Sequence, residues 1–276
     1  MAQRFDQREL RLRLISAVAL GIVSFLCLWL HQLSFAALVA TLAVIMAWEW
    51  GRAVRSVDRD QCLIAHCAGL LSIISAAFFA PAILTFLVLL LATVAVFAVA
   101  PKGARTMSAL GAVYIGIPAI LVLWLRQDAE YGVQAILFVL VVVAAHDTFA
   151  MIIGKLVGGP RLWPVLSPNK TWSGVIGGLA ASLLAGLLMG LLIEGNPPLF
   201  WLTLLGLVLG IAGLVGDLAE SAFKRTYEIK NASGLVPGHG GILDRLDGLI
   251  VAITVAAIIG LGINSNAPGR ALLFLE

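Results

Sequence analysis

Three aspartates near the C-terminal end of the chain have the type and spacing that metal-dependent chemistry requires. Asp244 and Asp247 belong to "PGHGGILDRLD" (237–247) at the start of a long apolar run, and Asp217 follows the apolar run before it. In a helix, residues three positions apart project to one side. Carboxylates held so close repel each other unless a cation lies between them, and Mg²⁺ prefers such oxygen ligands. The pattern predicts a metal site formed by Asp217, Asp244 and Asp247.

A glycine-rich segment precedes the aspartate pair. "ASGLVPGHGG" (232–241) cannot form a regular helix, and Gly238, Gly240 and Gly241 would let backbone amides approach an anion closely. Basic residues lie on both sides of it, at Lys224, Arg225, Lys230 and Arg245. A metal beside an anion-binding loop and several cations indicates phosphoryl or nucleotidyl transfer, where positioning and charge neutralisation do most of the catalysis.

The stretch after Asp217 and the stretch around residue 146 add further polar groups. If a helix continues past Asp217, Ser221, Lys224 and Glu228 share its face. In "AAHDTFAMIIGK" (144–155), His146 and Asp147 lie within an apolar run, where ionisable groups are costly and indicate a function by default. The alternative is a buried hydrogen-bonded pair that joins two helices.

A third polar segment is "LSPNKTWSGVIGG" (166–178). Ser167 before Pro168 predicts a helix N-cap with proline in the first turn, and the free amides of such a start attract anions. Lys170 and Thr171 would add a cation and a hydroxyl group for a phosphate. The alternative is an ordinary capped helix start with a snorkelling lysine.

The elements that must position these residues are membrane-spanning helices. The chain has 276 residues, of which 61% are hydrophobic and 12% charged. A helix of about 20 apolar residues crosses a bilayer, whereas barrel strands would alternate polar and apolar residues, which these runs do not. The sequence predicts an all-α, polytopic integral membrane protein with about nine transmembrane helices, at about 14–30, 33–50, 63–79, 81–100, 108–125, 133–153, 174–193, 198–216 and 248–263.

Basic residues predict how these helices are oriented. With nine spans, all but Arg126 and Arg270 of the 18 lysines and arginines fall on one side. Lysine and arginine are enriched in cytoplasmic loops. We therefore expect the N-terminus and the larger loops to be cytoplasmic and the C-terminus to lie on the far side. The first helix is expected to be uncleaved, because no small-residue cleavage site follows the basic N-terminus. The net charge of +3 reflects this bias and indicates no nucleic-acid partner.

The two halves of the chain differ in their polar content. Residues 1–130 form an N-terminal transmembrane region with little chemistry, and residues 131–276 form a C-terminal region that carries the polar motifs. Trp48, Glu49 and Trp50 end the second span, where tryptophans are typically interface anchors. "CLIAHC" (62–67) is expected to be an ordinary helix start with reduced thiols, because no second pair of metal ligands exists elsewhere.

Residues 221–247, "SAFKRTYEIKNASGLVPGHGGILDRLD", resemble the signature of the phosphatidate cytidylyltransferases, also called CDP-diacylglycerol synthases. Several elements match in order and spacing, and "HDTFAMIIGK" and "SPNKTW" look like upstream blocks of that family. The resemblance implies that CTP and phosphatidate give CDP-diacylglycerol and pyrophosphate. It also implies a divalent metal such as Mg²⁺, in some members a second, potassium-like cation (K⁺), a homodimer, and a bacterial-type inner (plasma) membrane with the active site on the cytoplasmic face.

The resemblance also implies residue roles. By motif match, the metal ligands would be Asp217, Asp244 and Asp247, the last two of which are also counted among the catalytic residues. The other catalytic residues would be Lys224, Arg225, Lys230 and His239. The substrate-binding residues would be Asp147, Ser167, Lys170, Thr171, Ser221, Gly238, Gly240, Gly241 and Arg245. The chain departs from the family at Asn231, where an aspartate is usual, and at Asn169 and Ser173, where lysine and glutamate are frequent.

Other functions remain open from the residues alone. A CTP-dependent lipid kinase of the dolichol-kinase type would share the membrane architecture and the nucleotide. A CDP-alcohol phosphotransferase fits poorly, because Asp247 and Gly248 are not followed by its two further aspartates. A proton-coupled transporter using His146 and Asp147 would place its polar residues near the midplane of paired repeats. Here they cluster at one face, and no repeat is visible.

Overall fold

The computed structural model describes residues 21–54, 60–235 and 240–276. Two helices before residue 80 are Gln32–Ala53 (α2) and Asp60–Phe79 (α3), and a shorter apolar helix spans Gly21–Leu30. They are followed by Ala82–Val99 (α4), Arg105–Gln127 (α5), Gly132–Val157 (α6), Trp172–Leu192 (α7), Leu199–Thr226 (α8), Leu243–Ile263 (α9) and Pro268–Phe274 (α10). Two short strands, Arg161–Trp163 (β1) and Ser167–Thr171 (β2), form an antiparallel hairpin between α6 and α7.

The helices confirm the predicted fold class. Eight of those in the described ranges, α2 to α9, are long and apolar enough to cross a membrane. The first predicted span is represented by the short helix Gly21–Leu30, and its residues 14–20 lie outside the described part. Many large apolar side chains are exposed, among them Ile83 and Leu90 on α4. Such exposure suits helices that face lipid.

Two predictions about local structure are wrong. Ser167 does not cap a helix: it lies in strand β2, and the N-cap of α7 is Thr171. Proline disfavours helical geometry in the residue before it, so Pro168 keeps Ser167 extended. Helix α8 continues past Asp217, which was the condition for the shared face, but it ends at Thr226. Glu228 therefore does not share its face and has a positive φ of 55°.

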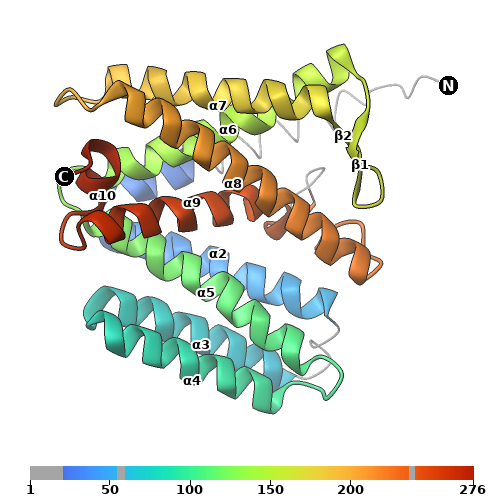
Figure 1. Cartoon of the computed structure of the whole chain (residues 1–276). Helices are drawn as coiled ribbons and strands as arrows, with labels where there is room; N and C mark the ends of the chain where they lie inside the picture. The colour runs from blue at the N-terminus through green and yellow to red at the C-terminus, as the bar shows by residue number, and fades with distance from the viewer. Residues whose placement is uncertain (1–20, 55–59, 236–239) are drawn as a thin grey trace. The chain divides into compact units, whose positions relative to one another are not determined.

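The chain divides into two compact units that do not follow the order of the sequence. Unit 1 contains Met1–Ile120 and Tyr227–Arg245, and unit 2 contains Leu121–Thr226 and Leu246–Glu276. The described residues before and after 236–239 thus pack with the N-terminal helices. In unit 1, α3 and α4 lie side by side (Figure 1). The indole N–H of Trp50 on α2 donates to the carbonyl of Met107 on α5 at 2.8 Å.

Trp50 is not an interface anchor. Its side chain is buried, with 8% of its surface exposed, and it packs against Gly111, where any added Cβ would overlap the indole ring. Nor does "CLIAHC" form a metal site among the described residues. The buried His66 ring instead bridges two helices, with Nε2 2.9 Å from the Ser108 carbonyl oxygen.

In unit 2, α6, α7 and α8 pack closely against one another (Figure 1), and small residues lie at their contacts. A Cβ on Gly186 of α7 would overlap the Leu202 carbonyl oxygen, and a Cβ on Gly206 of α8 would overlap that of Ser182. Small residues let membrane helices approach at backbone distance. The same device joins α8 to α9, where Gly213 and Gly216 face Gly248 and the Asp247 backbone.

Candidate active site

The close approach of α8 and α9 places Asp217 and Asp247 in one neighbourhood of unit 2. Asp217 directly follows Gly216, whose missing side chain leaves room for the carbonyl oxygen of Asp247. The Asp247 side chain accepts from the amide of Gly248 at 2.7 Å. The negative charges of Asp217 and Asp247 both act on Asp147 of α6. Three helices therefore bring three carboxylates within electrostatic reach of one another.

Two lysines balance this negative charge. Lys170 of β2 forms an ion pair with Asp217. Two turns further along α8, the Lys224 ammonium lies 2.5 Å from the carboxylate of Glu220, a residue that is only 4% exposed. A buried carboxylate is costly unless it is paired, so Lys224 compensates Glu220. A negatively charged substrate could compete with the carboxylates in these ion pairs for the two lysines.

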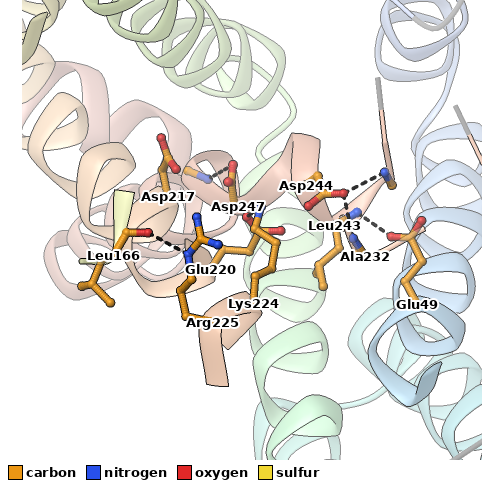
Figure 2. Close-up of polar contacts among 12 residues, drawn as sticks. Glu49, Leu166, Asp217, Glu220, Lys224, Arg225, Ala232, Leu243, Asp244 and Asp247 are labelled. Carbon is orange, nitrogen blue, oxygen red and sulfur yellow. Dashed lines mark hydrogen bonds and ion pairs between the residues drawn. The ribbon is translucent and has the colours of Figure 1, made fainter. Parts of the chain in front are cut away.

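The β hairpin holds Lys170 in place. The Thr171 hydroxyl accepts from the Gly174 amide at 3.2 Å, which caps α7, and the Ser173 hydroxyl donates to the Gly158 carbonyl. At the neighbouring end of α8, the Arg225 guanidinium donates to the carbonyl of Leu166 at 3.3 Å (Figure 2). The segment 166–171 therefore lies beside the C-terminal end of α8. The "SPNKTW" motif is thus close to Lys224 and Arg225, which were predicted to belong to the same active site.

His146 has the packing role that was the alternative to a functional one. Its ring is 3% exposed, and Nδ1 lies 3.3 Å from the Ser182 hydroxyl of α7. Gly178 and Gly210 leave space for this ring. Asp147, the next residue, is exposed on α6. The adjacent pair is therefore split between a buried helix contact and an accessible carboxylate.

The glycine-rich segment in unit 1 is organised around Asp244. Its Oδ2 atom accepts from the amides of Ala232 and Gly241, each at 2.9 Å (Figure 2). Gly240 has φ 84°, in the left-handed region that favours glycine, and a Cβ there would lie 2.9 Å from the same Oδ2. Asp244 thus stabilises the turn into α9, a role that the metal hypothesis did not include.

The buried carboxylate of Glu49 is the residue that sequence reasoning missed. Glu49 on α2 is 0% exposed and accepts from the Leu243 amide at 2.7 Å (Figure 2). It also accepts from the Ile242 amide at 2.9 Å and from the Ser233 hydroxyl. Each hydrogen bond to a charged acceptor contributes about 1.5–3 kcal/mol. The only available signal was an ionisable residue at the end of an apolar span.

The remaining predicted residues are placed as follows. Ser221 is half-buried on α8, whereas Lys230 and Asn231 are exposed after it, and Arg245 is exposed on the first turn of α9. Gly238 and His239 lie outside the described residues. Asp244 and Arg245 belong to unit 1, whereas Asp217 and Asp247 belong to unit 2.

The donor chemistry suits a hard divalent cation. Within the described ranges, no three His, Cys, Asp or Glu side chains are already arranged to hold a metal ion. Mg²⁺ does not require such a cage, because it is usually bound by one or two carboxylates together with substrate phosphates and water. Asp217 and Asp247 could supply those carboxylates.

Comparisons with known proteins agree on one family. The profile of the Cytidylyltransferase family matches residues 11–261. A phosphatidate cytidylyltransferase of Brucella abortus is 35% identical over 257 residues, covering 91% of this chain and 93% of that protein. The phosphatidate cytidylyltransferase of Bacillus subtilis is 39% identical over 141 residues, covering 51% and 52% of the two chains. One from Staphylococcus saprophyticus is 39% identical over 146 residues, covering 53% and 55%.

Proposed function

The chain belongs to the cytidylyltransferase family, and we propose that it makes CDP-diacylglycerol from CTP and phosphatidate, with release of pyrophosphate. In this reaction, a phosphate oxygen of phosphatidate attacks the α-phosphorus of CTP. A new P–O–P bond forms, and the bond to the β-phosphate breaks. One substrate comes from water and the other from lipid, so the reaction suits a polytopic membrane protein.

The observation that carries this proposal is the family match over residues 11–261, because it spans the carboxylates and lysines of unit 2 that were described above, here called the charged cluster. The charged cluster contains the ion pairs Lys170–Asp217 and Lys224–Glu220. Each pair can exchange partners when a triphosphate binds, because the lysine can move to phosphate oxygens. The lysines and Arg225 would then neutralise charge that develops on the transferred and leaving groups.

Mg²⁺ is part of the proposal. Bound with CTP, it would neutralise phosphate charge and make the α-phosphorus more electrophilic. Asp217 and Asp247 are the carboxylates best placed to hold it, with Asp244 on the same helix as Asp247. A second, potassium-like cation, a homodimer, a bacterial inner membrane location and a cytoplasmic active site complete the proposal. Predicted contacts from Ser221, Lys230, His239 and the glycines to substrate belong to it as well.

Product analysis tests this function. Purified protein in detergent is incubated with phosphatidate, Mg²⁺ and radiolabelled CTP. We expect labelled CDP-diacylglycerol and an equal amount of pyrophosphate. Unlabelled phosphorylated lipid with labelled CDP would instead identify a CTP-dependent lipid kinase. The comparisons do not favour that kinase or a transporter, because the relatives named above are all cytidylyltransferases.

A further inference from the structure

The Glu49 carboxylate holds the described residues on both sides of segment 236–239. On the N-terminal side it accepts from the Ser233 hydroxyl, and on the C-terminal side from the amides of Ile242 and Leu243. These partners are more than 180 positions away from Glu49, with separations of 184, 193 and 194 residues. A side chain of α2 therefore sets where the glycine-rich segment ends and where α9 begins.

The local geometry is built around this carboxylate. The amides at a helix start have no partner within the helix, and Glu49 satisfies two of them. Gly241 allows the approach, because a Cβ there would lie 2.6 Å from Oε1 of Glu49. Asp244 completes the arrangement by accepting from Ala232 and Gly241. Glu49 and Asp244 together hold the chain before and after the turn.

We propose that Glu49 is a positioning residue for cytidylyl transfer, acting through the start of α9, which carries Asp244 and Asp247. This inference rests on the proposed function. Glu49 is fully buried and already saturated by three donors, so its role is to orient the segment and not to contact substrate. A misplacement of about 1 Å at a reacting group can lower a rate about 10²-fold.

The charge of Glu49 is essential to this role. All three partners present a hydrogen to the carboxylate, and only the Ser233 hydroxyl can turn to accept. In Glu49→Gln, an amide oxygen at the Oε2 position would leave the Ile242 amide unpaired. An oxygen at the Oε1 position would turn the NH₂ group toward the Leu243 amide. Either orientation leaves one buried N–H group without an acceptor.

Three variants test the inference. Glu49→Gln disturbs the α9 start directly. Ser233→Ala removes one donor to the same carboxylate but keeps both α9 amides paired. Trp50→Phe is the matched control, because it removes the buried hydrogen bond that the adjacent residue on α2 donates to the Met107 carbonyl and keeps the three hydrogen-bond partners of Glu49. For each variant we would measure kcat, the KM for CTP, the melting temperature, and hydrogen exchange of peptides covering 231–243 and of peptides in α7 and α8.

We expect Glu49→Gln to lower kcat about 10²-fold with little change in KM. We also expect faster exchange in 231–243 and unchanged exchange in α7 and α8. Ser233→Ala should lower kcat less, and Trp50→Phe should retain near wild-type kcat even if its melting temperature falls. Equal losses of kcat in Trp50→Phe and Glu49→Gln at matched melting temperatures would overturn the proposal, and so would wild-type kcat in Glu49→Gln.

Two further outcomes are decided by the same data. If Glu49→Gln does not fold, Ser233→Ala decides: a lower kcat with local exchange supports the proposal, and wild-type values overturn it. If the wild-type protein makes no nucleotide-lipid, the proposed function fails and the catalytic part of this inference with it. The exchange comparison still separates that failure from an error about how Glu49 holds the segment.

Discussion

At the scale of single residues, the two units contain different kinds of carboxylate: some pair with lysines, and others pair with backbone amides. Asp217 and Glu220 belong to the first kind, through Lys170 and Lys224. Asp244 belongs to the second. A substrate phosphate can compete for a lysine, whereas a backbone amide is fixed by the fold. The two kinds of carboxylate should therefore respond differently to substitution.

Asp217→Asn and Asp247→Asn should each lower turnover at least about 10²-fold, because each would remove a hard oxygen ligand and misplace the α-phosphate. Asp244→Asn should lower turnover too, but its amide oxygen can still accept from Ala232 and Gly241, so the turn should persist. Pyrophosphate release measured against Mg²⁺ concentration checks all three. Unchanged rates and Mg²⁺ dependence would show that these residues do not bind the metal.

The control for these variants follows from the structure. Asp128 is also a carboxylate, and it lies close in sequence to Arg126, on the predicted far side of the membrane. A substitution of Asp128 would therefore be the first choice for a variant that leaves activity unchanged. Asp128 is unsuitable, because it is 6% exposed and accepts from the amides of Glu130, Tyr131 and Arg270. Glu194→Gln is the better control. Glu194 is exposed after the C-terminal end of α7, about 30 Å along that helix from Lys170.

Asn231 tests the departure from the family pattern. Asn231→Asp should retain or raise activity and lower the Mg²⁺ concentration for half-maximal rate, because it restores a carboxylate beside the segment that Asp244 holds. Asn231 is exposed, so the added charge costs little desolvation. The measurement is again rate against Mg²⁺ concentration. A large loss of activity would mean that the amide group itself has a specific role.

At the scale of secondary-structure elements, the crossing of α8 and α9 decides how close Asp217 and Asp247 can be. Glycines at the contact leave no side chains between the two backbones. The Cβ of a Gly248→Ala variant would lie 3.0 Å from the Gly213 carbonyl oxygen, and the Cβ of Gly216→Ala would overlap the Asp247 carbonyl oxygen. The distance between the helices is therefore set by residues that carry no chemistry.

Gly216→Ala should separate α8 from α9, lower the free energy of unfolding by about 1–3 kcal/mol and reduce turnover, because overpacking forces the backbones apart. Gly262→Ala in α9, the helix against which Gly216 packs, is the matched control, since a Cβ there would meet nothing within 4 Å. Melting temperature and pyrophosphate release measure both effects. Equal behaviour of the two variants would show that the crossing tolerates a methyl group.

At the scale of the whole molecule, charge and hydropathy predict how the chain lies in a membrane. In unit 2, Lys155 lies at the C-terminal end of α6, a helix of 26 residues. Near the N-terminal end of α6, Asp128 accepts from the backbone amide of Arg270. The side chain of Arg270 forms an ion pair with Glu276. That ion pair raises the pKa of Arg270, so this arginine keeps its charge.

Reporter fusions test the orientation. Fusions in the loops near Arg105, Lys170 and Lys230 should report a cytoplasmic location, and a fusion at the C-terminus should report the far side. The reason is the concentration of lysine and arginine on one side of the nine predicted spans. The loop near Arg55, which belongs to the same prediction, lies outside the described residues. A cytoplasmic signal at the C-terminus would contradict nine spans in this orientation.

The amino-acid sequence was enough to predict the membrane-spanning helices and to recognise the family. Long apolar runs can only be spanning helices, because the bilayer offers no partners for backbone polar groups. The motif around Asp244 and Asp247 is local, so it can be read without a fold. The shared face of Asp217, Ser221 and Lys224 also follows from helix geometry alone, once α8 continues beyond Asp217.

Only the tertiary structure decided which distant groups meet. The pairing of Lys170 with Asp217 depends on the β hairpin, and that of Glu49 with the α9 amides joins positions 193 and 194 residues apart. Sequence periodicity has no access to such separations, because it reports only neighbours along one helix. For the same reason Trp50 was expected at the membrane interface, whereas packing between α2 and α5 buries it, and its indole N–H donates to the Met107 carbonyl.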